Sequence, residues 1–354
     1  MPPTLLGVDV KLKPWEQSPP MHNRWHPEIP AVATVEPGQV FRVETVDWTG
    51  GQIKNDDSAD DVKNVDLTQV HYLSGPIAVS TAEPGDLLRV ELLNLGALPG
   101  DEWGFCGSFH KDNGGGFLCD HYPQATKACW DLEGINCSSR HIPGVKFAGL
   151  IHPGLIGTAP SAELLAMWNG KHPHPPFPPS PLTHTHTLRR AACHVEEGTP
   201  GAMLGKFGHC TVMAGKDETW DRIASEGART VPGRENGGNC DIKGGMKLLP
   251  AVGPSPLCVN PIFELGPLEP RYSEWLVFEG ISVDEKGRQH YLDATLAYKR
   301  AVLNAIKYLA NFGYTEEQVY LLLSCCPCEG RISGIVDVPN AVATLAIPMA
   351  IFDR

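Results

Sequence analysis

The 354-residue chain lacks an excess of positive charge, and its formal net charge is −12. A surface of this sign repels phosphate groups, which argues against a nucleic-acid-binding or membrane-surface protein. Runs of about 18 apolar residues are also missing, so no transmembrane helix is expected. Residues 1–15 lack the basic-then-apolar pattern of a signal peptide, which favours a cytoplasmic protein.

Cysteine is plentiful, with 11 residues, but a second Cys-x-x-Cys pair to complete a zinc module is missing. The cysteines are scattered, with a local cluster at Cys325, Cys326 and Cys328. Without a secretion signal we expect them to be reduced thiols. The cysteine pattern therefore does not predict a metal site.

Glycine and proline are abundant, with 37 and 32 residues, and they separate short β-type runs. Strands are predicted over Gln39–Asp47, Pro76–Ser80 and Asp86–Leu95, where apolar residues alternate or cluster. The first 150 residues are therefore predicted to be mainly β-structure with long loops.

Capping residues mark three helices. Ser161 precedes Ala162–Trp168, Asp293 precedes a segment through Ala310 that Gly313 ends, and Thr315 with Gln318 opens a helix through Leu323. We therefore predict an α+β, β-rich protein with a β-sandwich-like core and a few helices, the longest of them near the C-terminus.

Long blocks of the chain resemble the acetamidase/formamidase family, in its longer formamidase branch. The blocks that carry the resemblance are His22–Pro30, Val46–Ile53, Asn55–Asp61, Val70–Ile77, Asp112–Pro123, Arg140–Ser161, Ala228–Lys243, Phe278–Glu285 and Gly334–Asn340. The resemblance implies one amidohydrolase domain, with a β-rich N-terminal part at 1–170 and the remainder, with the C-terminal helices, at 191–354.

The chain departs from the family pattern at two places. Residues 171–190 form a proline-rich, low-complexity insertion that we expect to be disordered. After Lys243 the family continues for several tens of residues with a block of the type Gly-Asp-Leu/Ile-His … Gly-Asp-Gly-Glu. Here Lys243 is followed directly by sequence from beyond that block, as a retained intron and a skipped exon would produce.

Hydrolysis of an unactivated amide needs an activated water or nucleophile, a group that polarises the carbonyl, and a proton donor for ammonia. The resemblance implies a divalent metal ion, zinc as the first choice, that supplies the first two functions. The acidic and histidine residues of the missing block would be its natural ligands. Asp241 and Glu44 are the remaining candidate ligands.

Glycine-flanked polar residues supply the other candidates. Asn239 and Cys240 follow Gly237-Gly238, which allow close backbone approach, although a glycine turn with a side-chain cap is an equal alternative. We assign Asn239 and Asn113 to substrate binding. Cys240 is a candidate nucleophile and His152 a candidate acid or base, with a structural hydrogen bond as the alternative for His152.

We therefore expect hydrolysis of formamide, or a similar small primary amide, to the carboxylate and ammonia. An indole-3-acetamide type of aromatic amide is an alternative substrate. Two further alternatives are an inactive truncated subunit that acts as a scaffold and a non-enzymatic amide-binding protein. The resemblance also implies a homo-oligomer, and neither a nucleic acid nor a membrane is expected as a partner.

Overall fold

The computed structural model describes residues 2–149, 154–168, 218–231, 233–234, 236–239, 245–250, 262–265, 271–336 and 338–353. The chain divides into two compact units. Unit 1 comprises residues 1–54, 65–98 and 151–267, and unit 2 comprises residues 55–64, 99–150 and 268–354. The predicted insertion at 171–190 lies outside the described residues, and the boundaries at 170 and 190 stay predictions.

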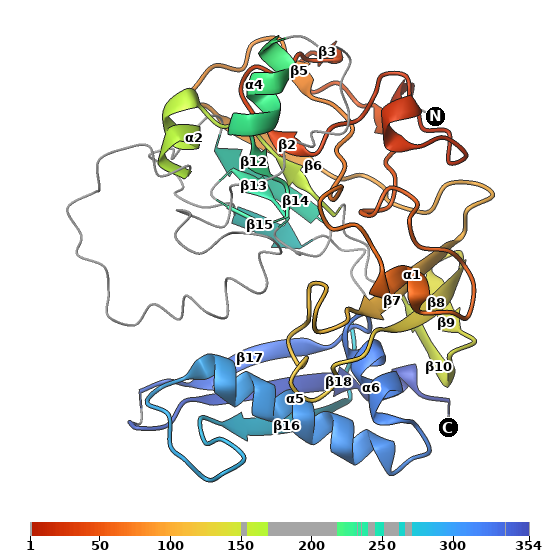
Figure 1. The fold of residues 1–354 in the computed structure, drawn as a ribbon, viewed down its shortest axis with the longest axis vertical. Coiled ribbons are helices and arrows are strands. Elements are labelled where there is room, and N and C mark those ends of the chain that lie inside the picture. Colours follow the sequence, from red (N-terminus) through yellow and green to blue (C-terminus); the bar gives the residue numbers. More distant parts are fainter. Residues whose placement is uncertain are drawn as a thin grey trace. The chain divides into compact units, whose positions relative to one another are not determined.

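Unit 1 is built from short strands joined by long loops (Figure 1). Its strands pair as β1 (Thr4–Leu6) with β4 (Arg42–Val43), β3 (Ala33–Val35) with β5 (Ile77–Val79), β2 (Arg24–Trp25) with β12 (Ala228–Arg229), β11 (Ile156–Gly157) with β13 (Gly237–Gly238), and β14 (Gly245–Pro250) with both β6 (Leu87–Glu91) and β15 (Ile262–Leu265). Among its described residues, the helices are the short η1 (Pro14–Glu16), α2 (Ala162–Trp168) and α4 (Glu218–Glu226).

The predicted strands of unit 1 are confirmed in place but not in length. Within Gln39–Asp47 only Arg42–Val43 is a strand. The Asp47 carboxylate accepts hydrogen bonds from the backbone amides of Thr49 and Gly51 at 2.8 and 2.7 Å. Such side-chain-to-backbone bonds stabilise a turn in place of an extended ladder. The predicted strand at Asp86–Leu95 likewise ends early, at Glu91.

Unit 2 contains two antiparallel sheets. One orders β7 (Trp103–Ser108), β8 (Thr126–Glu133), β9 (Asn136–Ser139) and β10 (Ile142–Ala148); the other orders β16 (Trp275–Ile281), β18 (Val342–Pro348) and β17 (Glu329–Gly334). The helices are α1 (Asp60–Lys63), α5 (Ala294–Ala310), α6 (Glu316–Leu323) and the short η2 (Met349–Ile351). Helix α5 packs along the second sheet (Figure 1).

All three predicted helices are confirmed, each with its expected cap. The Ser161 hydroxyl accepts the amide of Leu164 at 3.0 Å, and Asp293 accepts that of Leu296 at 2.9 Å. Thr315 and Gln318 exchange side-chain-to-backbone bonds of 2.8 and 3.1 Å, which is the predicted capping box. These signals succeed because a cap satisfies orphan amides within its own helix.

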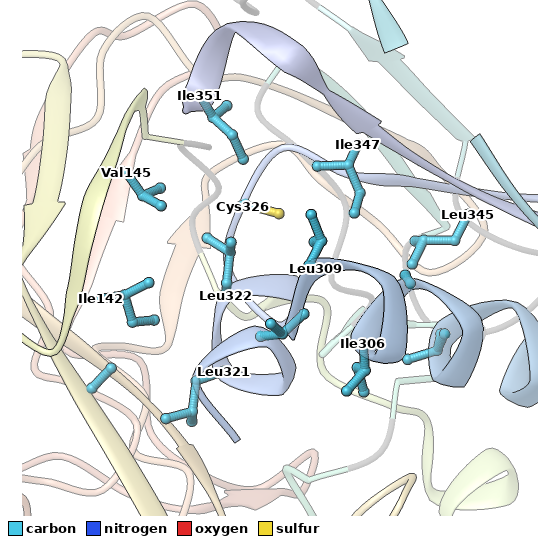
Figure 2. Packing of buried hydrophobic residues seen from close by; sticks show 14 of the residues in the cluster. Ile142, Val145, Ile306, Leu309, Leu321, Leu322, Cys326, Leu345, Ile347 and Ile351 are labelled. Carbon is cyan, nitrogen blue, oxygen red and sulfur yellow. The ribbon is translucent and has the colours of Figure 1, made fainter. Parts of the chain in front are cut away.

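The hydrophobic core of unit 2 lies between α5, α6 and the strands that face them. Figure 2 shows Ile306, Leu309, Leu322 and Ile347 close together, with the Cys326 sulfur among these aliphatic side chains. The strands and few helices confirm the β-rich α+β class, whereas the sandwich-like core stays a prediction. Among the described residues, we find no helix long and apolar enough to cross a membrane.

The buried Lys127 forms ion pairs with the acidic segment Asn55–Asp61. The Lys127 side chain on β8 is 1% exposed, and its ammonium group pairs with Asp56 and Asp61 at 2.8 and 2.9 Å. The guanidinium of Arg140 pairs with Asp57 at 2.8 Å. Three carboxylates of this acidic run are thus engaged by cationic side chains of the same unit.

Removal of the lysine charge is expected to destabilise unit 2. Lys127→Met should lower the free energy of unfolding by about 3 kcal/mol, because Asp61, 12% exposed, loses the cation that compensates its partial burial. Urea unfolding followed by circular dichroism measures the change. Lys146→Met is the matched control, because Lys146 and Glu133 form an exposed pair at 3.8 Å and its loss should cost less than about 1 kcal/mol. Equal effects of the two variants would contradict the prediction.

Candidate functional site

Unit 1 contains a group of buried polar side chains where β2 meets β12. We call it the polar cluster, and its members are His22, Asn23, Arg24, Arg229 and Thr230. Ladder pairing sets Arg24 opposite Arg229 and Trp25 opposite Ala228. Burial of polar groups is costly unless hydrogen bonds compensate for the lost water. A concentration of buried polar side chains therefore indicates a candidate binding site.

Thr230 fastens His71 to this cluster. The Thr230 hydroxyl accepts the backbone N–H of His71 at 2.8 Å and donates to the His71 carbonyl at 2.7 Å. Thr230 is 0% exposed, so both bonds are shielded from water. A single buried hydroxyl thus fixes the backbone of His71 relative to β12, although the two residues are far apart in sequence.

The imidazole of His71 is held as a neutral group. Burial lowers its pKa to about 4, and the nearby charge of Arg229 acts in the same direction. Trp48 meets the ring edge-on, with centroids 5.2 Å apart. Nδ1 is buried and forms no hydrogen bond with any described residue. An unprotonated imidazole has a ring nitrogen with a free lone pair, which is the form that acts as a general base.

His22, a member of the polar cluster, is also a neutral histidine, and its hydrogen bond with Arg24 sets its tautomer. Its Nδ1 lies 2.9 Å from the carbonyl oxygen of Arg24, and because a carbonyl only accepts, Nδ1 carries the proton. Burial lowers the pKa of His22 to about 4, and the bond to Arg24 opposes this shift only in part. The backbone of His22 also pairs with Leu73, two residues beyond His71.

These two histidines predict a loss of stability in acid. Because their pKa is near 4 in the folded chain and 6.5 ordinarily, unfolded chains take up protons that the folded state refuses as pH falls from 6.5 to 4. Each histidine should lower the free energy of unfolding by about 1.4 kcal/mol per pH unit in this window. Thermal unfolding at several pH values measures the slope.

The variant His22→Asn tests the source of that slope, because asparagine keeps a donor for the Arg24 carbonyl but does not titrate. It should remove about half of the slope that the two histidines produce between pH 6.5 and 4, because His71 still titrates. His290→Asn serves as the control, since His290 lies in a part-exposed pair with Asp284 in unit 2. A slope that His22→Asn leaves unchanged would assign the acid sensitivity to other groups.

Gly157 on β11 and Gly238 on β13 pack closely against Trp25. A Cβ on Gly157 would lie 2.8 Å from the Gly238 nitrogen and 2.9 Å from the Trp25 ring, inside normal contact distance. Gly238 also has φ +75°, a conformation that favours glycine. The Asn239 amide then donates to the Val231 carbonyl at 2.7 Å, which closes the turn next to Thr230.

Of the other five candidate site residues, two lie among the described residues. Asp241, Cys240 and His152 lie outside the described residues. The Glu44 carboxylate in unit 1 accepts the amide of Val8 at 3.0 Å and pairs with Arg42 at 2.9 Å. The Asn113 amide in unit 2 donates to the Lys63 carbonyl at 3.0 Å. The structure therefore brings Asn239 to the polar cluster. Glu44 and Asn113 instead form hydrogen bonds with backbone groups of Val8 and Lys63.

Sequence analysis missed His71, His22 and Thr230 as candidates. All three lie inside the blocks that carry the family resemblance, which was the available signal. Their burial and their mutual contacts depend on strands that are distant in sequence. Sequence reasoning had no means of pairing His71 with Thr230.

The described residues do not provide a metal-binding set. Within these ranges, no group of three or more histidine, cysteine, aspartate or glutamate residues is placed to hold an ion. Glu44, a predicted ligand, is engaged by Arg42 and Val8. The polar cluster is thus described by its histidines and their hydrogen-bond partners, and the candidate ligand Asp241 lies outside the described residues.

The chain is similar to known proteins over most of its length. The chain is 44% identical to "Formamidase" of Methylophilus methylotrophus over 396 aligned positions, which cover 99% of this chain and 94% of that protein. It is 43% identical to "Acetamidase" of Mycolicibacterium smegmatis, with 93% and 91% covered. The solved structure of the gamma lactamase from Delftia acidovorans matches with a TM-score of 0.88 and 46% identity, over 99% of this chain and 94% of that chain.

The same comparisons bear on the missing segment. The 396 aligned positions outnumber the 354 residues of this chain, so the Methylophilus protein has residues without a counterpart here. The profile of the Acetamidase/Formamidase family matches residues 7–250 and 255–354, with its break a few residues beyond Lys243. Both observations agree with a missing internal segment. With nearly the whole length matched, the chain belongs to the Acetamidase/Formamidase family and is an amide hydrolase.

Proposed function

We propose that this chain hydrolyses formamide, or a similarly small primary amide, to the carboxylate and ammonia, with His71 as the proton-transfer residue. The supporting observation is a neutral, part-exposed histidine fixed by a buried threonine in the unit that also holds the Gly-Gly-Asn turn. The relatives at 43–44% identity are named formamidase and acetamidase, which supports a small acyl group. No comparison supports an aromatic amide, an inactive scaffold or non-enzymatic binding.

The proposed chemistry follows from the protonation state of His71. Its imidazole takes a proton from the attacking water as the water oxygen adds to the amide carbon. It then returns that proton to the departing nitrogen, so that ammonia leaves and the carboxylic acid ionises. Arg229 favours the neutral form before the reaction, and Thr230 and Trp48 hold the backbone and ring in one orientation.

A cyclic amide is a second candidate substrate. The Delftia protein that matches with a TM-score of 0.88 is titled a gamma lactamase. A γ-lactam carries the same carbonyl–nitrogen bond as a primary amide, but the amine remains attached to the product. Its hydrolysis would release no ammonia, so the two substrates require separate assays.

The remaining parts of the proposal are a divalent metal ion, with zinc as the first choice, a homo-oligomer and a cytoplasmic location. The metal rests on the family resemblance, and Asp241, a candidate ligand, lies outside the described residues. The oligomer is supported by apolar side chains such as Val277 and Ile281 on β16, which are 56% and 39% exposed. Metal analysis and the mass of the particle in solution test these parts separately.

One set of assays tests the proposal on the purified full chain. Ammonia release is followed with formamide, acetamide and indole-3-acetamide, and ring opening is followed with 2-pyrrolidinone. We expect the highest kcat/KM with formamide or acetamide. A preference for indole-3-acetamide would refute the small-substrate proposal, and a preference for 2-pyrrolidinone would establish the lactam alternative. A folded chain without turnover on all four would favour the inactive subunit.

A further inference from the structure

Two thiols converge on one backbone carbonyl in unit 2. Cys106 lies on β7, and Cys325 lies just beyond the end of α6. Each sulfur is 3.4 Å from the carbonyl oxygen of Leu321, within hydrogen-bonding distance for a thiol. Both residues are partly buried. Sequence analysis placed Cys325 in a local cluster but gave no sign of Cys106 beside it.

The surroundings of Cys106 favour its thiolate. Hydrogen bonding from the Cys325 thiol is the largest cause, and it lowers the pKa of Cys106 to about 7 even though burial acts in the opposite direction. The indole N–H of Trp130 donates to the Cys106 sulfur at 3.2 Å and contributes in the same sense. The thiolate is the form of cysteine that reacts with electrophiles and peroxides.

Neighbouring cysteines show the opposite behaviour. Burial raises the pKa of Cys137 to about 11, and it also raises the pKa of Cys129. Cys326 is fully enclosed by the aliphatic core (Figure 2), and both a hydrogen bond with Cys328 and burial raise its pKa. Cys325 also has a raised pKa, from burial first and then from Cys106, which fits a second thiol that reacts after the first.

We propose that Cys106 and Cys325 form a peroxide-reactive pair that closes to a disulfide. The Cys106 thiolate attacks one oxygen of hydrogen peroxide, the O–O bond breaks, and hydroxide leaves Cys106 as a sulfenic acid. The Cys325 sulfur then attacks the oxidised sulfur, the S–O bond breaks, and the Cys325 proton leaves with the hydroxyl as water. The peroxide is thereby reduced by the electrons of two thiols. This site lies within unit 2 and is independent of the proposed amide substrate.

The disulfide would join β7 covalently to the segment after α6. These elements belong to the same core, in which α6 packs against β7 and β8. A cross-link between distant parts of the sequence restricts the unfolded chain more than the folded one. Oxidation is therefore expected to stabilise unit 2 against unfolding.

Graded oxidation of the reduced full chain tests the pair. After treatment with hydrogen peroxide and blocking of remaining thiols, peptide mass spectrometry should find the Cys106–Cys325 link before any other disulfide. Alkylation by iodoacetamide at neutral pH should be more than about a hundredfold faster at Cys106 than at Cys137, given their different thiolate fractions. A different first disulfide, or equal alkylation rates, would overturn the proposal.

Serine variants separate the two roles. Cys325→Ser should leave a sulfenic acid at Cys106 that dimedone labels, and Cys106→Ser should abolish both the label and the link. Cys119→Ser, a part-buried cysteine elsewhere in unit 2, is the control and should leave the link unchanged. Circular dichroism establishes that each variant is folded. A folded Cys325→Ser chain that dimedone does not label at Cys106 would refute the first step.

Discussion

The His71→Asn variant is expected to lose at least about a hundredfold in kcat for formamide, the range for loss of a proton-transfer residue. Asparagine fits the space and leaves the backbone bonds to Thr230 available. Its amide cannot accept and return a proton, so the chemical step slows while substrate binding changes less. Steady-state ammonia release, with kcat and KM determined separately, measures the effect.

Two controls show whether the loss reflects chemistry. His290→Asn removes a histidine from a part-exposed pair in unit 2 and should keep nearly full activity. The pH profile of residual activity in His71→Asn should lose the acid limb that a base with a low pKa produces in the native chain. If His71→Asn retains native kcat, or loses it only through unfolding, His71 is not the proton-transfer residue.

The Gly280→Ala variant is expected to lose about 3 kcal/mol of unfolding free energy, which is the upper end for overpacking a core. Gly280 on β16 faces α5, and a Cβ there would overlap the Ala297 carbonyl oxygen and the Ala301 nitrogen. The helix atoms at this contact are backbone atoms of Ala297, Arg300 and Ala301, so no flexible side chain can move away. Helix α5 would have to shift from the sheet. Urea unfolding measures the loss as a lower urea concentration at the midpoint of the transition.

Gly334→Ala is the matched control for that substitution. Gly334 lies on β17 of the same sheet, and a Cβ there would meet no atom within 4 Å. It should change stability by less than about 0.5 kcal/mol. A small loss in Gly280→Ala, comparable with that of Gly334→Ala, would show that α5 and the sheet can separate at low cost.

The helices show where sequence reasoning is sufficient. The caps at Asp293 and Thr315 bond amides three residues away, so the signal and its partner lie in the same short segment. The strands show where it is not. The segment 39–47 alternates like a strand, yet Asp47 forms a turn, and pairing with β1 covers only Arg42–Val43. A strand's length depends on its partner, which periodicity does not identify.

Sequence reasoning was sufficient for the ends of three helices, the β-rich class, the family and the amide chemistry that the family implies, whereas helices α1 and α4 were not predicted. Tertiary structure alone decided which polar residues meet. His71 and Thr230 are 159 positions apart, and Cys106 and Leu321 are 215 apart, yet each pair shares a hydrogen bond. Burial then lowers the pKa of His71, and neighbouring donors lower the pKa of Cys106. Such shifts depend on solvent exclusion and on neighbours brought in by folding, which no local pattern encodes.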